Sequence, residues 1–226
     1  MARIDTLINF LTDVAAAIKA KKGDSTPIPA ADFDTEIANL PSGDDSMLIS
    51  LIDRTATSFE IPEGTTSIGY YAFANCSSLA SIIIPDGVTL IGEGAFALCT
   101  SLTSITIPDS VTSIGDSAFY GCTSLTSVII GNGVTSIGDS AFYGCTGLTS
   151  ITIPSSVTSI EYYAFRGCTN LTEIDFSMHN AVPTLADTSA FSNTSSSLVI
   201  KVPSALLDEW KAATNWSTYA DKIVGV

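Results

Sequence analysis

The chain has 226 residues, of which 46% are hydrophobic and 14% are charged, so it holds enough apolar material for a packed core. Its 23 acidic and nine basic residues give a formal net charge of −14, and residues 61–175 contain a single base, Arg166. Binding to nucleic acid or to an anionic membrane requires clustered lysine and arginine, so the composition argues against both functions. No run of 18 apolar residues occurs, and membrane insertion is not expected.

The first 43 residues differ from the rest of the chain. Their apolar residues recur at spacings of three and four, which is typical of an amphipathic helix of about 17 residues. A second, shorter helix is expected between Pro29 and Pro41, so we predict a helical hairpin over 1–43. Because Asp5 and Asp13 interrupt the apolar stretch, no signal peptide is predicted.

We expect this hairpin to be an attachment module. Its apolar stripe covers only about two heptads, which is too short for a free coiled coil, so the stripe must be buried against something else. We predict that it packs in a homo-oligomer or against other proteins of a virion. The stripe consists of Ile4, Leu7, Leu11, Val14 and Ile18.

A long internal repeat dominates the remaining sequence. Residues 44–60 are predicted to form a linker and a degenerate first coil. A block of 23 residues then recurs five times without a gap, beginning at Ile61, Ile84, Ile107, Ile130 and Ile153. A period of this length predicts a solenoid in which each unit stacks its apolar face on the next. We assign 61–200 to the repeats and 201–226, which contains both tryptophans, to a C-terminal helical cap.

Each copy is expected to supply one strand and one helical turn, which makes the predicted fold an α/β repeat. In the third copy the spacing predicts a strand of a parallel sheet with Leu102, Ile105 and Ile107 inward. Asp116 is placed to cap a helical turn that runs through Phe119. The phenylalanine recurs in every copy and predicts a buried aromatic column of Phe73, Phe96, Phe119, Phe142 and Phe165.

The cysteines also occupy one repeat position. Since ligands of a metal site must converge in space, one cysteine every 23 residues predicts a column along the solenoid and no metal site. We expect the thiols to be reduced and to act as small buried hydrophobic groups. No cofactor is expected. The column comprises Cys76, Cys99, Cys122, Cys145 and Cys168.

Positions that vary between copies are free of the demands of stacking and are candidates for binding. The tenth, eleventh and fourteenth positions carry exposed aromatic residues and the one base of the repeats, types that are enriched in binding hot spots. The predicted binding surface is Tyr70, Tyr71, Tyr120, Tyr143, Tyr162, Tyr163 and Arg166. Two alternatives stay open: these rings cover the edge of the core, or the small hydroxyls of the strand face bind carbohydrate.

Catalysis is not expected. A serine or threonine nucleophile needs a base within hydrogen-bond reach, and the only histidine, His179, is predicted to lie in an irregular loop. Asp116 and Asp139 could form a pair of carboxylates, but they hold the same repeat position, and helix capping explains each one separately.

Two segments resemble known families. The block IPDSVTSIGDSAFYGCTSLTSVI (107–129) resembles the BspA-type leucine-rich repeat, and VPSALLDEWKAATNWSTYADKIV (202–224) is similar to the C-terminal cap of such arrays. The resemblance covers residues 47–226 and implies a leucine-rich-repeat solenoid without shared catalytic residues. The family includes bacterial surface adhesins and fibre-like phage proteins. The motifs AIKAKKG and ADFDTEIANLP of the N-terminal segment are similar to leaders of phage and prophage structural proteins.

Three functional hypotheses follow. We predict a non-enzymatic phage or prophage virion component, a fibre or decoration protein, which is exposed on a virion or extracellular particle and binds a protein or glycan on a cell surface. The alternative is a bacterial cell-surface adhesin. A carbohydrate-active enzyme on a β-solenoid is the third hypothesis, and the lack of a paired-acid constellation outside the repeat disfavours it.

Overall fold

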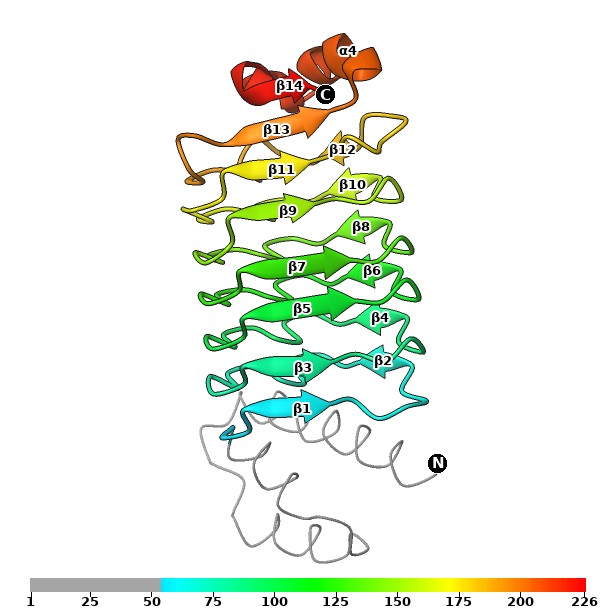
Figure 1. Cartoon of the computed structure of the whole chain (residues 1–226), viewed down its shortest axis with the longest axis vertical. Helices are drawn as coiled ribbons and strands as arrows, with labels where there is room; N and C mark the ends of the chain where they lie inside the picture. The colour runs from blue at the N-terminus through cyan, green and yellow to red at the C-terminus, as the bar shows by residue number, and fades with distance from the viewer. Residues whose placement is uncertain (1–53) are drawn as a thin grey trace, which may run out of the picture.

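The computed structural model describes residues 54–226, which form a straight stack of coils (Figure 1). The predicted hairpin, its apolar stripe from Ile4 to Ile18 and residues 44–53 lie outside the described residues. Each coil contributes one strand to the front of the view in Figure 1 and one shorter strand behind it. The front strands are β1 (Ser58–Glu60), β3 (Ser81–Ile83), β5 (Ser104–Ile107), β7 (Ser127–Ile130), β9 (Ser150–Thr152), β11 (Glu173–Asp175) and β13 (Val199–Val202).

The shorter strands form one continuous parallel sheet. They are β2 (Ser67–Ile68), β4 (Leu90–Ile91), β6 (Ser113–Ile114), β8 (Ser136–Ile137), β10 (Ser159–Ile160) and β12 (Thr184–Leu185). The front strands also pair in parallel, and the register joins equivalent positions of neighbouring copies, as in Ile105 with Val128. One 23-residue copy therefore makes one coil, and the prediction of a solenoid with a parallel sheet is confirmed.

The interior is built from columns of identical residues. Phe73, Phe96, Phe119, Phe142 and Phe165 are buried, and consecutive rings stack with centroids 5.2 to 5.3 Å apart. Phe59 and Phe191 extend this column at its two ends. The inward positions of the third copy, Leu102, Ile105 and Ile107, are each at most 2% exposed. The predicted aromatic column and strand orientation are confirmed.

The five cysteines form a second internal column. All are free and buried, as predicted. The thiol of Cys122 donates a hydrogen bond to the Phe96 carbonyl at 3.1 Å, and Cys99, Cys145 and Cys168 repeat this contact. Burial raises the pKa of the Cys122 and Cys168 thiols to about 12. The column therefore consists of neutral thiols that link neighbouring coils.

The helical turn predicted in each copy is absent from the described repeats, so the α/β character expected from the sequence is wrong there. Between Asp116 and Gly121 the backbone hydrogen bonds alternate: Ala118 N–H bonds to Gly115 three residues earlier, whereas Phe119 N–H bonds to Ala141 of the next coil. A helix would direct all these donors back along its own segment. Because every second N–H group bonds to the next coil, the segment forms a series of turns and not a helix.

The C-terminal residues contain the only helices of the described chain. They are η1 (Ser204–Leu206), α4 (Leu207–Ala212) and η2 (Trp216–Lys222), and β14 (Ile223–Gly225) follows and pairs in parallel with β13. Trp210 and Trp216 are at most 1% exposed and pack on Phe176, with ring centroids 4.9 and 5.4 Å away. No helix among residues 54–226 has the length and apolar character needed to cross a membrane.

Candidate functional site

The candidate residues lie on the edge of the stack formed by the turns after the short strands. Each turn segment includes a residue with positive φ at the eleventh position, for example Ser117 and Ser140. Three residues later, at the fourteenth position, Tyr120, Tyr143 and Arg166 point outward. The preceding residues Phe119 and Phe142 point into the core. Buried and exposed residues thus lie side by side in this short segment, and the candidate side chains point outward from the edge of the stack.

Four of the predicted residues meet in one group. The Tyr120 and Tyr143 rings stack with centroids 4.9 Å apart and an interplanar angle of 13°. The Arg166 guanidinium carbon lies 6.0 Å from the centroid of the Tyr143 ring and 5.1 Å from that of Tyr163. We call Tyr120, Tyr143, Tyr163 and Arg166 the Tyr–Arg column. Tyr120 and Tyr163 are each 38% exposed, so the column faces solvent.

The other predicted tyrosines are arranged differently. Tyr70 and Tyr71 form a separate edge-to-face pair in the first coil, with ring centroids 4.2 Å apart. The second coil separates this pair from the Tyr–Arg column, because it carries Glu93 and Gly94 at the corresponding positions. Tyr162 is exposed and adjoins the column at Tyr163. The seven predicted residues therefore form two groups along the edge.

Arg166 has an unusual electrostatic setting. Among the described residues the only ion pair is Lys201–Glu173, so Arg166 has no carboxylate partner there. Its Nε atom is buried and makes no hydrogen bond within residues 54–226. The contacts with Tyr143 and Tyr163 are of the cation–π type, which favours a guanidinium over the ring face. The aromatic rings fix this cation without neutralising it.

The aspartates of this edge serve the stack and do not cap helices. Asp116 Oδ1 accepts a hydrogen bond from the Asp139 backbone N–H at 2.9 Å, and Asp139 Oδ1 accepts one from Tyr162 N–H at 3.1 Å. The predicted helix cap at Asp116 is therefore wrong, because the donor comes from the next coil. Both residues remain exposed, so their negative charges flank the Tyr–Arg column.

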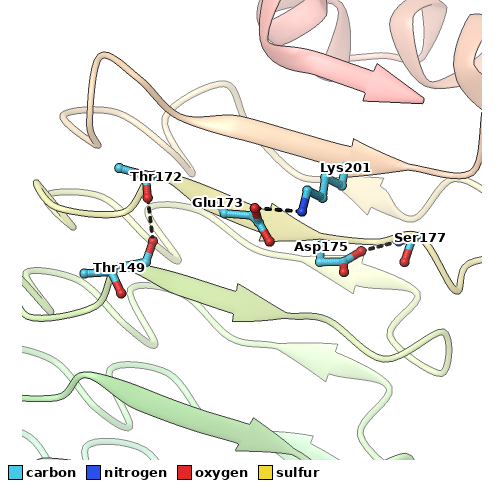
Figure 2. A network of polar contacts seen from close by, with 6 residues as sticks. All are labelled: Thr149, Thr172, Glu173, Asp175, Ser177 and Lys201. Atoms are coloured by element: carbon cyan, nitrogen blue, oxygen red, sulfur yellow. Dashed lines mark hydrogen bonds and ion pairs between the residues drawn. The ribbon is translucent and has the colours of Figure 1, made fainter. Parts of the chain in front are cut away.

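The front face, formed by the longer strands, is the alternative candidate for a binding surface. Threonines just before these strands donate to the backbone of the preceding coil, as in Thr126 to Thr103 and Thr172 to Thr149, both 3.1 Å, whereas Thr106 and Thr152 on the strands make no such bond to the described coils. Figure 2 shows where this pattern ends: Glu173 pairs with Lys201 at 2.8 Å, and Asp175 accepts a hydrogen bond from Ser177. This charged cluster was not predicted from the sequence, although charges at strand positions that carry Ser or Thr in earlier copies were a signal.

His179 does not have the surroundings of a catalytic base. It lies in an irregular segment, as predicted, but it is only 5% exposed and packs edge-on against Phe176 at 5.1 Å. Within residues 54–226 neither ring nitrogen has a hydrogen-bond partner of normal geometry. Burial lowers the pKa of His179, while nearby backbone groups and the Asp175 charge act in the opposite direction. Residues 54–226 contain no group of three or more His, Cys, Asp or Glu side chains suited to a metal ion.

Comparison with known families agrees with this geometry. Residues 53–172 and 89–209 match the family described as BspA type leucine rich repeat region, in six copies. The chain belongs to this family. Repeats of the BspA type are typically binding or structural and not catalytic. No curated protein matches the chain.

Several solved structures of bacterial proteins are similar to this chain. A leucine-rich repeat protein of T. pallidum is 28% identical and has a TM-score of 0.53, with 74% of this chain and 70% of that chain covered. A leucine-rich repeat protein of Bacteroides ovatus is 32% identical with a TM-score of 0.49, and the match covers 66% of this chain and 46% of that one. The pneumococcal vaccine antigen PcpA shares the fold at 21% identity and a TM-score of 0.58, over 75% of this chain and 40% of that chain. This chain thus spans less than half of the Bacteroides protein.

Proposed function

We propose that this chain is a non-enzymatic binding protein that presents the Tyr–Arg column to a protein or glycan at a cell surface. One observation carries the proposal: two stacked tyrosines, a third tyrosine and an arginine without an ion-pair partner among the described residues gather on one edge of the stack, where Tyr120 and Tyr163 are exposed and Tyr143 and Arg166 are partly exposed. Tyrosine and arginine contribute a large share of binding energy at protein interfaces. Rings that are already stacked lose little conformational freedom when a partner binds.

The core does not require an aromatic or basic residue at the fourteenth position. All five 23-residue copies keep the buried phenylalanine and cysteine, whereas the fourteenth position holds Ala74 and Ala97 in the first two copies. The coils that contain alanine stack with the same parallel register as those that contain tyrosine. A tyrosine at this position therefore adds surface that the solenoid does not need, which supports a role in recognition.

We propose a bacterial cell-surface adhesin as the setting for this binding, since the relatives of the repeat region are bacterial leucine-rich repeat proteins. The T. pallidum protein covers most of the repeat region at 28% identity. The comparisons give no support to a role in a phage virion. Attachment through residues 1–43 and assembly into a homo-oligomer remain predictions, which removal of 1–43 followed by measurement of the oligomeric state would test.

For the C-terminal segment we propose the role of a cap. Trp210 and Trp216 fill the end of the stack against Phe176 and Phe191, where a further coil would otherwise be needed. The Trp216 ring N–H donates to the Pro183 carbonyl at 2.8 Å, and the Tyr219 hydroxyl donates to the Thr188 carbonyl. These contacts reach the irregular coil that precedes β13 and tie the segment to it.

The binding proposal is tested with an array of immobilised extracellular proteins and glycans probed with the labelled full chain. We expect binding to at least one component and a loss of about tenfold or more for Tyr120→Ala/Tyr143→Ala. The matched control is Ile83→Ala/Ile129→Ala, which removes two side chains that are 60% and 59% exposed on the front face. Equal binding by the column variant and the wild type, or no binding to any component, would contradict the proposal.

A further inference from the structure

Arg166 is an isolated cation in an acidic protein. It is the only base within residues 61–175, where nine acidic residues occur. In such surroundings an arginine could readily acquire a carboxylate neighbour, yet none of the described residues places one within ion-pair distance. Lys201, on the front face, does pair with Glu173 at 2.8 Å. The neighbouring Asp139 uses one carboxylate oxygen to accept the Tyr162 N–H and forms no ion pair with Arg166.

The position of the guanidinium is nevertheless defined. Tyr143 and Tyr163 contact it from two coils, with centroid distances of 6.0 and 5.1 Å. Its Nε atom is buried and finds no hydrogen-bond acceptor in the described coils. A guanidinium held by aromatic rings offers its planar array of N–H donors in a fixed orientation, and this array matches the two oxygens of a carboxylate. The described coils therefore supply no anion to this guanidinium.

We propose that Arg166 anchors a carboxylate of an aspartate or glutamate side chain in a partner polypeptide. The inference rests on the binding function proposed above and specifies its chemistry. The carboxylate binds the guanidinium, and the neighbouring residues of the partner lie against Tyr120 and Tyr143. Because the rings already position the arginine, forming this ion pair requires little ordering of the site.

The charges beside the column favour a polypeptide over an acidic polysaccharide. Glu93, Asp116 and Asp139 are exposed at the tenth position of successive coils along the same edge. They would repel a chain with a negative charge on every unit. A polypeptide that carries basic residues next to its acidic one would instead find complementary charges. The formal net charge of −14 also disfavours an acidic polysaccharide.

Glycines leave the flank of the column open beside Tyr143 and Arg166. Gly144 and Gly167 occupy the fifteenth position with φ of 69° and 75°, so they add no side chains there. Gly121, with φ of 68°, is covered by the Leu98 side chain of the second coil. Their N–H groups all bond to the next coil, for example Gly144 to the Arg166 carbonyl at 2.8 Å. In the second coil Leu98 takes this position and is exposed. An extended segment can therefore approach the column along backbone that needs no further hydrogen bonds.

The test uses two short synthetic peptides and an acidic sugar as probes. The first peptide, Lys-Gly-Ser-Glu-Gly-Ser-Lys with blocked ends, carries the carboxylate between two bases, and its twin has Gln in place of Glu. The sugar probe is an oligogalacturonate. Binding to the full chain is followed by NMR through the Arg166 side-chain Nε–H signal and the tyrosine ring signals. Arg166→Gln is the test variant, and Arg54→Gln, at an exposed arginine outside the 23-residue copies, is its matched control.

We expect the Glu peptide to shift the Arg166 and Tyr143 signals saturably and to bind roughly tenfold to a hundredfold more tightly than its Gln twin. Arg166→Gln should abolish that difference, whereas Arg54→Gln should keep it. Equal binding of the two peptides, or unchanged discrimination in Arg166→Gln, would overturn the inference. Tighter binding of the oligogalacturonate than of the Glu peptide would overturn the choice of a polypeptide.

The same variants separate this inference from the proposed function. If Tyr120→Ala/Tyr143→Ala loses binding on the array of extracellular components while Arg166→Gln keeps it, the column binds a partner but Arg166 is no anchor. If neither variant loses binding, the proposed function itself fails. Loss in both variants supports both.

Discussion

The regular coils and the C-terminal segment bury their aromatic side chains in different ways. In residues 61–175 the side chains of the buried columns pack on their equivalents in the next coil, and consecutive phenylalanine rings are parallel within 5 to 8°. In residues 176–226 unlike rings meet at steep angles, 87° for Phe176 with Trp216 and 81° for Phe191 with Tyr219. In the repeats the same residue type fills a given core position in each copy, whereas the end of the stack is filled by residues that occur only there.

The largest expected effect is the difference in thiol reactivity of the cysteine column between the native and the unfolded protein. Burial raises the pKa of Cys122 from its usual value of 9.0 to about 12, which lowers the thiolate fraction by roughly a thousandfold. We expect the native protein to react extremely slowly with a thiol reagent near pH 8 and all five thiols to react after unfolding. Cys76, at the start of the column, should react first. Rapid reaction of Cys122 in the native protein, or fewer than five thiols after unfolding without reductant, would contradict this picture.

Phe119→Ala should produce one of the largest losses of stability among single substitutions in the regular coils. The ring is fully buried and stacks on both Phe96 and Phe142. Its removal should cost about 3 to 5 kcal/mol of unfolding free energy. Urea denaturation measures the loss, with Tyr120→Ala as the adjacent, exposed control. Equal losses for the two variants would show that the inner and outer faces of the turn are wrongly assigned.

His179 allows the C-terminal packing to be tested by pH. Burial lowers its pKa, so below the unfolded value of about 6.5 the unfolded chain takes up a proton that the folded chain does not. Its contribution to stability is therefore intact above about pH 6.5 and declines as the pH falls. We expect wild type to lose more stability than His179→Phe between about pH 7.5 and about pH 5. Parallel pH profiles of the two proteins would exclude this role for His179.

The smallest expected effect concerns the threonine hydroxyls that link coils. Thr112 donates to the Thr89 carbonyl at 3.2 Å, a contact repeated at Thr89, Thr135 and Thr158. Thr112→Val keeps the branched shape and removes one exposed hydrogen bond, so it should cost about 0.5 to 1 kcal/mol. Thr152→Val is the control, since Thr152 is exposed on the front face and makes no such bond to the described coils. A cost no larger than that of the control would show that the contact adds nothing measurable.

The repeat period explains why the regular coils were predictable from the sequence. Identical residues at identical positions must stack, so Phe119, Cys122 and Ile105 could be placed from the period alone. The helical turn at Asp116 was predicted wrongly because local propensity does not reveal that alternate N–H groups bond to the neighbouring coil. The position of His179 depended on contacts with Trp210, which has no counterpart in the repeats.

The candidate site was predictable only in part for the same reason. Variable, exposed positions identified the tyrosines and Arg166, but positions along a chain do not say which side chains touch. The division between Tyr70–Tyr71 and the Tyr–Arg column follows from the second coil, where Gly94 lies under the Tyr71 ring. The absence of an ion pair at Arg166 among the described residues could not be predicted from the sequence either, because it depends on where the carboxylates point. Asp139 accepts the Tyr162 N–H, and Glu173 pairs with Lys201.

The central claim is that the Tyr–Arg column serves binding and not stability. The most direct measurement is the unfolding free energy of Tyr120→Ala/Tyr143→Ala, taken on the same sample as its binding to the array of extracellular components. We predict a loss of stability of no more than about 1 to 2 kcal/mol, from the loss of partly exposed rings, together with a loss of binding of about tenfold or more. A loss of stability comparable to that of Phe119→Ala with binding unchanged would contradict the claim and make the column part of the packing.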